Sequence, residues 1–151
     1  MAVVTFDFDN TLTRTEAKYD EAGRFTHSEY IGGNGPVIEA LKASHASGDD
    51  IVVITSRSPS DSANVVKALD SLGVLGLISG LHCTAGVPKG EYMADRGISS
   101  TRHFDDDPAE AGYMPDCVEF VTVPVHASWD KHNETGPRSA PARMAAMMGA
   151  A

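Results

Sequence analysis

The chain has 151 residues, a hydrophobic fraction of 42%, a charged fraction of 22% and a formal net charge of -9. This length and composition are typical of one globular domain with its own core, and they exclude a chain dominated by disorder. The acidic balance argues against a broad basic surface for nucleic acid. No apolar stretch approaches bilayer length and no basic leader precedes the first strand, so we expect an intracellular, cytoplasmic protein without membrane contacts.

Hydrophobic patterning predicts strands that alternate with helices along the chain. The expected strands cover residues 2–8, 51–55, 75–79, 101–104 and 118–123, and the expected helices cover residues 36–47, 60–72 and 89–96. This alternation predicts an α/β fold with a doubly wound, Rossmann-like parallel sheet. The polar stretch 10–35 has room for a loop and a hairpin but not for a separate domain.

Two aspartates, Asp7 and Asp9, follow the first expected strand. Open α/β sheets bind ligands at the carboxyl ends of their strands, which is where these carboxylates fall. Residues two apart in a strand share a face, so we expect both carboxylates to converge on one cation or one phosphate. The alternative is a strand end with solvated acidic side chains.

Residues 51–54 are four consecutive β-branched apolar residues, which is typical of a strand buried on both faces. Thr55 therefore emerges at a strand end, where its hydroxyl and the following backbone N–H groups can bind a phosphate oxygen. Arg57 follows two residues later and is either a substrate contact or a surface residue.

Three adjacent carboxylates, Asp105, Asp106 and Asp107, close another expected strand. Their mutual repulsion is unfavourable unless a cation or a helix N-terminus compensates it. The alternative is a solvated acidic turn in which Asp107-Pro108 opens a helix, because proline suits the first helical position.

The run Phe6-Asp7-Phe8-Asp9-Asn10-Thr11-Leu12-Thr13 resembles the first motif of the haloacid dehalogenase-like superfamily of phosphohydrolases. The apolar strand closed by Thr55 is similar to the second motif, and the pair Asp105-Asp106 is similar to the fourth. The family also places a lysine upstream of the acidic pair. Lys89 fits this place by position, whereas its competitor Lys67 falls on the polar face of an expected helix.

The resemblance implies a Mg²⁺-dependent phosphatase that forms an aspartyl-phosphate intermediate. Asp7 would be the nucleophile, and Asp9 the general acid and base. The implied ligands of Mg²⁺ are Asp7, the backbone carbonyl of Asp9, Asp105 and Asp106, with Asp107 in reserve. The implied contacts to the substrate phosphate are Thr55, Ser56, Arg57 and Lys89.

The short insertions imply a capless member with a flap after the first strand and an open active site. The layout also has some similarity to the phosphatase domain of phage-type polynucleotide kinase–phosphatases, which remove 3′-phosphates from nucleic acid ends. A phosphorylated small molecule, such as a nucleotide or a sugar phosphate, is the other expected substrate. The alternative function is a non-catalytic relative that binds a cation or a phospho-ligand.

We expect the phosphatase domain to span residues 1–124 and a tail to span residues 125–151. Met144, Met147 and Met148 share one face of a helix in that tail. The segment is either a partly disordered terminus or a short helix that docks on the domain or on another subunit of a homo-oligomer. The six histidines show no zinc spacing and receive no role, although His103 is the one beside the acidic run.

Overall fold

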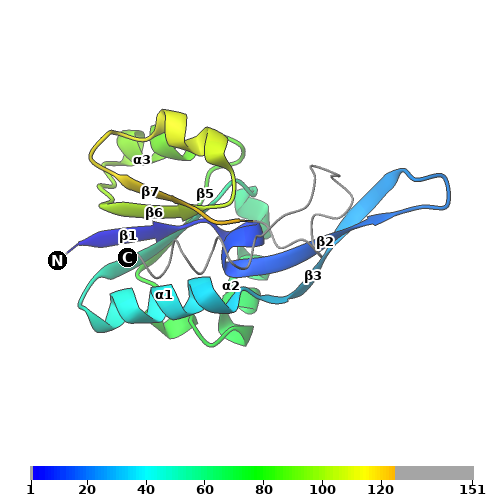
Figure 1. Ribbon diagram of the computed structural model, residues 1–151, viewed down its shortest axis with the longest axis horizontal. Helices are drawn as coiled ribbons and strands as arrows, with labels where there is room; N and C mark the ends of the chain where they lie inside the picture. The colour runs from blue at the N-terminus through cyan, green and yellow to red at the C-terminus, as the bar shows by residue number, and fades with distance from the viewer. Residues whose placement is uncertain (1, 125–151) are drawn as a thin grey trace.

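The computed structural model describes residues 2–124, so the expected tail with Met144, Met147 and Met148 lies outside the described residues. A sheet of five strands in the order β5-β4-β1-β6-β7 forms its centre (Figure 1). Every neighbouring pair in this sheet is parallel. The strands are β1 (Val3–Phe6), β4 (Asp50–Thr55), β5 (Gly80–Cys83), β6 (Arg102–Asp105) and β7 (Glu119–Thr122).

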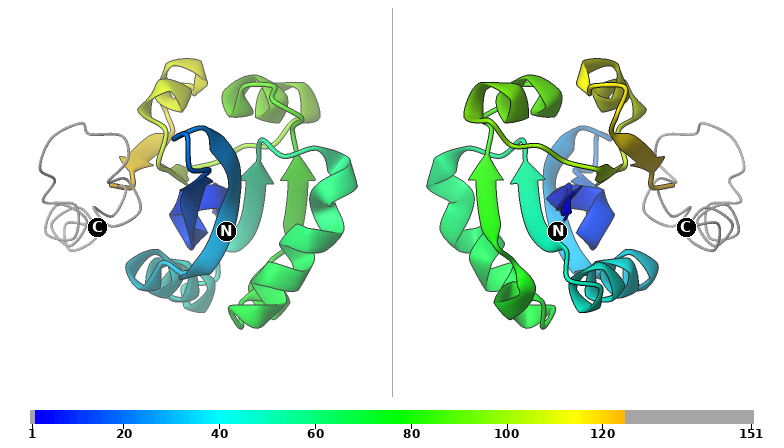
Figure 2. Two further views of the ribbon diagram at one scale, coloured as in Figure 1. Left: turned by 90° about the vertical axis from the view of Figure 1, so that its right-hand side faces the viewer. Right: turned by 90° about the vertical axis from the view of Figure 1, so that its left-hand side faces the viewer.

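Helical segments cover both faces of the sheet. Helices α1 (Gly35–Ala46) and α2 (Ser62–Ser71) lie on one face, and α3 (Lys89–Arg96) lies on the other with the 3₁₀ turn η4 (Pro108–Tyr113) (Figures 1 and 2). The expected doubly wound, Rossmann-like α/β fold is therefore confirmed. Within residues 2–124, no helix has the length and apolar character that a membrane span requires.

The strand order creates a topological switch beside the central strand. The chain leaves β1 for β4 and β5 on one side, and then crosses back to place β6 and β7 on the other side. Loops that follow β1 and β6 therefore diverge from each other, and the crevice between such loops is where open α/β sheets bind ligands. Both acidic motifs of the sequence emerge at this point.

The core lies between the central strands and the helices. Val4 and Phe6 of β1 and Val53 of β4 are at most 3% exposed. The ring of Phe6 stacks on that of Phe104 of β6, with centroids 4.6 Å apart and planes at 7°. These contacts hold the carboxyl ends of β1 and β6 side by side.

A two-stranded antiparallel hairpin, formed by β2 (Thr13–Tyr19) and β3 (Phe25–Gly33), occupies the stretch after the first strand. It projects from the body of the molecule as a long arm (Figure 1). Asp20 shapes the loop at its end, because its Oδ1 accepts hydrogen bonds from the backbone N–H groups of Ala22 and Arg24 at 2.9 Å. The expected flap is confirmed, and residues 2–124 contain no cap domain.

The prediction of a strand over residues 75–79 was wrong. Leu75–Leu77 forms a 3₁₀ turn, and the strand begins at Gly80, which pairs with Val52. The apolar residues of the turn pack against the core from outside the sheet, and a short apolar run does not distinguish that arrangement from a strand. The actual strand lies at the edge of the sheet and contains His82, so its pattern is less apolar than the pattern of the turn.

Candidate functional site

Asp7 extends the central strand by one residue. Its backbone N–H donates to the carbonyl of Phe104 at 2.8 Å, and its backbone remains extended. The residue is 4% exposed, so its carboxylate lies inside the edge of the sheet rather than in bulk water.

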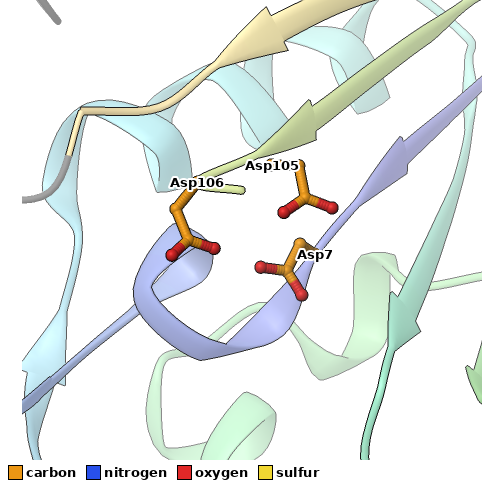
Figure 3. A group of neighbouring side chains, drawn as sticks. All are labelled: Asp7, Asp105 and Asp106. Carbon is orange, nitrogen blue, oxygen red and sulfur yellow. The ribbon is translucent and has the colours of Figure 1, made fainter. Parts of the chain in front are cut away.

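The carboxylates of Asp7, Asp105 and Asp106 meet at this edge. Each offers one oxygen, and the three oxygens lie within 4.8 Å of one another. Figure 3 shows Asp7 at the end of β1, and Asp105 and Asp106 at the end of β6, with their carboxyl groups turned toward a common space. The distant acidic motifs of the sequence thus form one cluster.

Lys89 is the cation of this cluster. Its Nζ lies 3.0 Å from Oδ1 of Asp7 and 2.8 Å from Oδ2 of Asp105, and the residue is 4% exposed. The competing residue from the sequence, Lys67, is exposed on α2. The structure thus brings Lys89, and not Lys67, to the acidic cluster.

Two neighbours fix Lys89 at the first position of α3. The Glu110 side chain accepts a hydrogen bond from the Lys89 backbone N–H at 2.9 Å, which satisfies a donor that the start of a helix leaves free. At Gly90, a Cβ atom would collide with the backbone of Tyr113, so glycine permits the close approach of η4 to the first turn of α3. Neither Glu110 nor Gly90 was identified from the sequence.

The electrostatics of the cluster are unbalanced. Burial raises the pKa of Asp7 well above its ordinary value, and repulsion from Asp105 adds to the rise while Lys89 opposes it. Burial likewise raises the pKa of Asp106, and Asp105 adds to this rise. Burial would also raise the pKa of Asp105, but the hydrogen bond from His103 and the charge of Lys89 outweigh it and hold that pKa below its ordinary value. One lysine does not compensate three carboxylates.

This donor set fits a magnesium ion. Mg²⁺ prefers hard oxygen ligands, and the cluster offers carboxylate oxygens from Asp7, Asp105 and Asp106 within 4.8 Å of one another. Burial raises the pKa values of Asp7 and Asp106 and repulsion among the carboxylates adds to the rise, and a divalent cation would compensate this repulsion.

The expectation that the Asp9 carboxylate converges with that of Asp7 was wrong. Strand alternation does not reach Asp9, because β1 ends at Phe6 and Asp9 lies in the tight turn η1 (Phe8–Leu12). Its carboxylate instead forms a two-pronged ion pair with Arg57, with Nε to Oδ2 at 2.9 Å and Nη2 to Oδ1 at 2.7 Å. Only the backbone carbonyl of Asp9 remains as its expected contribution to a metal site.

Polar side chains hold the turn η1. Asn10 has a left-handed φ of 59°, a conformation that asparagine tolerates better than most residues. Its Oδ1 accepts from the backbone N–H and the hydroxyl of Thr15, at 3.0 and 2.7 Å, which joins the turn to the hairpin. The hydroxyl of Thr11 donates to Oδ2 of Asp7 at 3.0 Å and lies 3.4 Å from Oδ1 of Asp106. Thr11 thus bridges the two acidic motifs.

The remaining predicted residues lie at the same edge in different environments. Thr55 ends β4 beside β1 and is fully buried, and its Oγ1 accepts from the Arg57 backbone N–H at 3.3 Å. Ser56 is exposed. Asp107 lies outside the cluster and caps η4, because its Oδ1 accepts from the Ala109 backbone N–H at 3.0 Å.

Sequence reasoning assigned no role to His103, which the structure places directly behind the cluster. The residue is fully buried, and its Nε2 lies 2.8 Å from Oδ2 of Asp105. The one available signal was its place two residues before Asp105 on the same strand, which puts both side chains on one face of the sheet.

No family model and no curated protein sequence matches this chain. Among solved structures, the chain is similar to the putative beta-phosphoglucomutase from Thermotoga maritima, with 15% identity, a TM-score of 0.56 and coverage of 95% of this chain and 91% of that chain. The class C acid phosphatase from Bacillus anthracis gives 13% identity, a TM-score of 0.49, and coverage of 98% of this chain and 78% of that chain. The first of these likenesses shows that the two proteins share an α/β fold, and it shows the fold alone.

Proposed function

We propose that this chain is a Mg²⁺-dependent phosphatase of the haloacid dehalogenase-like superfamily, that its catalytic domain spans residues 1–124, and that it hydrolyses phosphate monoesters through an aspartyl-phosphate on Asp7. The observation that carries the proposal is the convergence of the Asp7, Asp105 and Asp106 carboxylates, with Lys89 bridging two of them, at the topological switch of the sheet. The motif resemblance and the fold shared with a protein named as a phosphomutase support the same reading.

Asp7, Asp105, Asp106 and the backbone carbonyl of Asp9 would hold the Mg²⁺. The ion would neutralise charge between the anionic nucleophile and the anionic ester. Lys89 would act in the same direction, because its ammonium group is held between Asp7 and Asp105. Thr55 and Ser56, at the end of β4, would position the phosphate.

In the first step, an Asp7 oxygen attacks the phosphorus, and the bond from phosphorus to the leaving oxygen breaks. Asp9 donates a proton to that oxygen. In the second step, Asp9 takes a proton from water, the water oxygen attacks the phosphorus, and inorganic phosphate leaves Asp7. Each proton that Asp9 gives in the first step is thus recovered in the second.

Asp9 must leave its ion pair with Arg57 to carry this proton. The pair is about one-third exposed on both sides, at 30% for Arg57 and 33% for Asp9, so its separation does not require the core to open. A substrate phosphate offers the guanidinium the same two-pronged geometry as a carboxylate. We therefore infer that Arg57 exchanges Asp9 for the substrate phosphate.

The substrate classes to test are phosphorylated small molecules and nucleic acid ends. No cap domain intervenes in residues 2–124, which supports access for bulky phosphoesters to a capless site. The hairpin carries three exposed aromatic side chains of the kind that stack on bases, namely Tyr19, Phe25 and Tyr30. This feature is the reason to include oligonucleotides beside nucleotides and sugar phosphates.

The deciding experiment measures phosphate release from an aryl phosphate, a nucleotide panel, sugar phosphates and 3′-phosphorylated oligonucleotides, with Mg²⁺ and with chelator. We expect hydrolysis of at least one substrate with Mg²⁺, none with chelator, and none by Asp7→Asn. Activity that persists in chelator or in Asp7→Asn would overturn the proposed site. Mg²⁺ binding without hydrolysis of any substrate would instead favour a non-catalytic relative.

A further inference from the structure

A buried hydrogen-bonded chain connects the core of the sheet to the acidic cluster. Thr5 of β1 and His103 of β6 are register partners on adjacent strands, and both are fully buried. Oγ1 of Thr5 lies 2.7 Å from Nδ1 of His103, and Nε2 of His103 lies 2.8 Å from Oδ2 of Asp105. The chain therefore runs from Thr5 through the imidazole to Asp105.

The chemistry of the partners sets the direction of these hydrogen bonds. An ionised Asp105 carboxylate can only accept, so Nε2 of His103 carries the hydrogen. In the neutral ring, Nδ1 then accepts from the Thr5 hydroxyl, and this contact fixes the tautomer and the ring orientation. Each ring nitrogen of His103 has one defined partner.

The Asp105 carboxylate is held by donors on both oxygens. Oδ2 receives hydrogen bonds from His103 Nε2 and Lys89 Nζ, each at 2.8 Å, and Oδ1 receives one from the Asp107 backbone N–H at 3.0 Å. Two donors use both lone pairs of Oδ2, whereas Oδ1 keeps one lone pair. Oδ1 is therefore the oxygen that Asp105 has available for a cation.

We propose that His103, oriented by Thr5, is a positioning residue that fixes the Asp105 carboxylate with Oδ2 toward Lys89 and Oδ1 available to Mg²⁺. This inference rests on the proposed function. Packing alone does not explain why residue 103 is a histidine. A ring beside Phe120, at 5.6 Å between centroids, could be apolar, and a buried polar ring is costly unless its hydrogen bonds are made. The contacts of His103 use both nitrogens, and one of them acts on Asp105.

A matched pair of substitutions separates positioning from packing. His103→Gln puts an amide N–H near the place of Nε2, so it keeps a donor for Asp105. His103→Asn puts its amide near the place of Nδ1, so it keeps a partner for Thr5 and loses the donor to Asp105. Thr5→Val, which is similar in shape, removes the hydroxyl that orients the ring, together with the contact of that hydroxyl to Ser100 Oγ at 3.0 Å.

The measurements are the Kd of Mg²⁺ alone by titration calorimetry, the Mg²⁺ concentration for half-maximal phosphate release, and the Tm. We expect His103→Gln to stay within about threefold of the wild-type Kd, and His103→Asn and Thr5→Val to weaken Mg²⁺ about tenfold, as is typical for partners behind a metal ligand. Val121→Ala, in the core on β7, is the structural control: it lowers Tm and leaves the Kd unchanged.

Equal Kd values for wild type, His103→Gln and His103→Asn, with only the Tm lowered, would overturn the positioning role. Failure of the proposed phosphatase function would give a different set of results. A wild type that binds Mg²⁺ but hydrolyses nothing would remove the phosphatase, and the Kd values would still decide the role of His103. A wild type that binds no Mg²⁺ would overturn both proposals.

Discussion

The two aspartates of the first motif have the same chemistry and opposite surroundings. Asp7 is 4% exposed and pairs with Lys89, which is equally buried, whereas Asp9 is one-third exposed and pairs with Arg57 near the surface. Burial raises the pKa of Asp7, and its neighbours Asp105 and Asp106 add to the rise. Two residues of separation in the sequence therefore give one carboxylate in an inner, crowded cluster and another in an outer, accessible ion pair.

The surroundings of Asp7 and Asp9, and not the motif alone, indicate which role each carboxylate suits. A charge that is buried among other carboxylates requires a compensating cation, which suits a nucleophile beside Mg²⁺. A carboxylate in a partly exposed ion pair can change partner without opening the core, which suits a group that meets both substrate and water. The inner and outer carboxylates should therefore fail in different ways when they are changed.

The largest expected effect separates Asp7→Asn from Asp9→Asn by the leaving group. Asp7→Asn removes the proposed nucleophile, so turnover should fall at least about 10³-fold on every substrate. Asp9→Asn should lower turnover of an alkyl phosphate by about 10²–10⁴-fold, because its leaving oxygen needs a proton. On nitrophenyl phosphate, the leaving group departs as an anion, so Asp9→Asn should lower the rate of the first step only slightly. Burst kinetics measures this rate. Equal losses in the rate of the first step on both substrates would rule out Asp9 as the acid.

Replacing the cationic side chains of Lys89 and Arg57 should show the same contrast between the inner and the outer pair in the free energy of unfolding. Lys89→Met leaves Asp7 and Asp105 buried without their common partner, so we expect a loss of about 3 kcal/mol in the free energy of unfolding. Arg57→Met breaks a pair in which both side chains are about one-third exposed, so at most about 1 kcal/mol should be lost. Urea denaturation with chelator present measures both. Equal losses would contradict the division into an inner and an outer pair.

Mg²⁺ should stabilise the protein more strongly as the pH rises. Folding raises the pKa values of Asp7 and Asp106, so the folded chain binds more protons than the unfolded chain, and the metal-free protein loses stability as pH rises above the ordinary carboxyl pKa of 3.8. Mg²⁺ requires the ionised carboxylates and offsets this loss. The lowered pKa of Asp105 and the raised pKa of Lys89 change the stability only below pH 3.8 and above pH 10.5, outside the range of about pH 4 to pH 8 that the experiment covers.

Thermal denaturation with Mg²⁺ and with chelator, at several pH values between about 4 and 8, measures this linkage. At a fixed Mg²⁺ concentration of 100 times the Kd measured at pH 8, the stabilisation should reach about 2.7 kcal/mol at that pH and fall as the pH is lowered. Asp106→Asn is the control, because it removes one of the two raised carboxyl groups and should flatten the dependence on pH. A Mg²⁺-induced shift in Tm that does not change with pH would show that the ion does not bind these carboxylates.

The inner cluster could be anticipated from the sequence and the outer pair could not. Asp7 and Asp105 each close a segment that the sequence predicts as a strand, and the carboxyl ends of parallel strands meet at one edge, so their proximity follows once the fold class is known. The Asp9–Arg57 pair depends on where β1 ends and on how η1 turns, and neither is encoded in a simple residue period. Side-chain alternation therefore gave the wrong place for the Asp9 carboxylate.

The hydrogen bonds that link Thr5, His103 and Asp105 could not be predicted for a different reason. The contact of His103 with Thr5 depends on β1 and β6 being neighbours in register, although 98 residues separate the two positions. A sequence pattern predicts that both segments are strands, but strand order and register are properties of the folded sheet. The same applies to Glu110, which reaches the start of α3 from a turn later in the chain.

The last effect that we predict comes from the turn that carries Asp9 away from Asp7. Asn10→Ala loses the contacts to Thr15 and places at a left-handed φ of 59° a residue that tolerates this conformation less well than asparagine, so it should cost about 1–2 kcal/mol of stability. Asn10→Gly loses the same contacts but accepts the φ, so it should cost less. Urea denaturation ranks the two variants. If the turn positions Asp9, both variants should also slow hydrolysis of alkyl phosphates more than that of nitrophenyl phosphate, whereas equal slowing would place the effect of Asn10 on Asp7 instead.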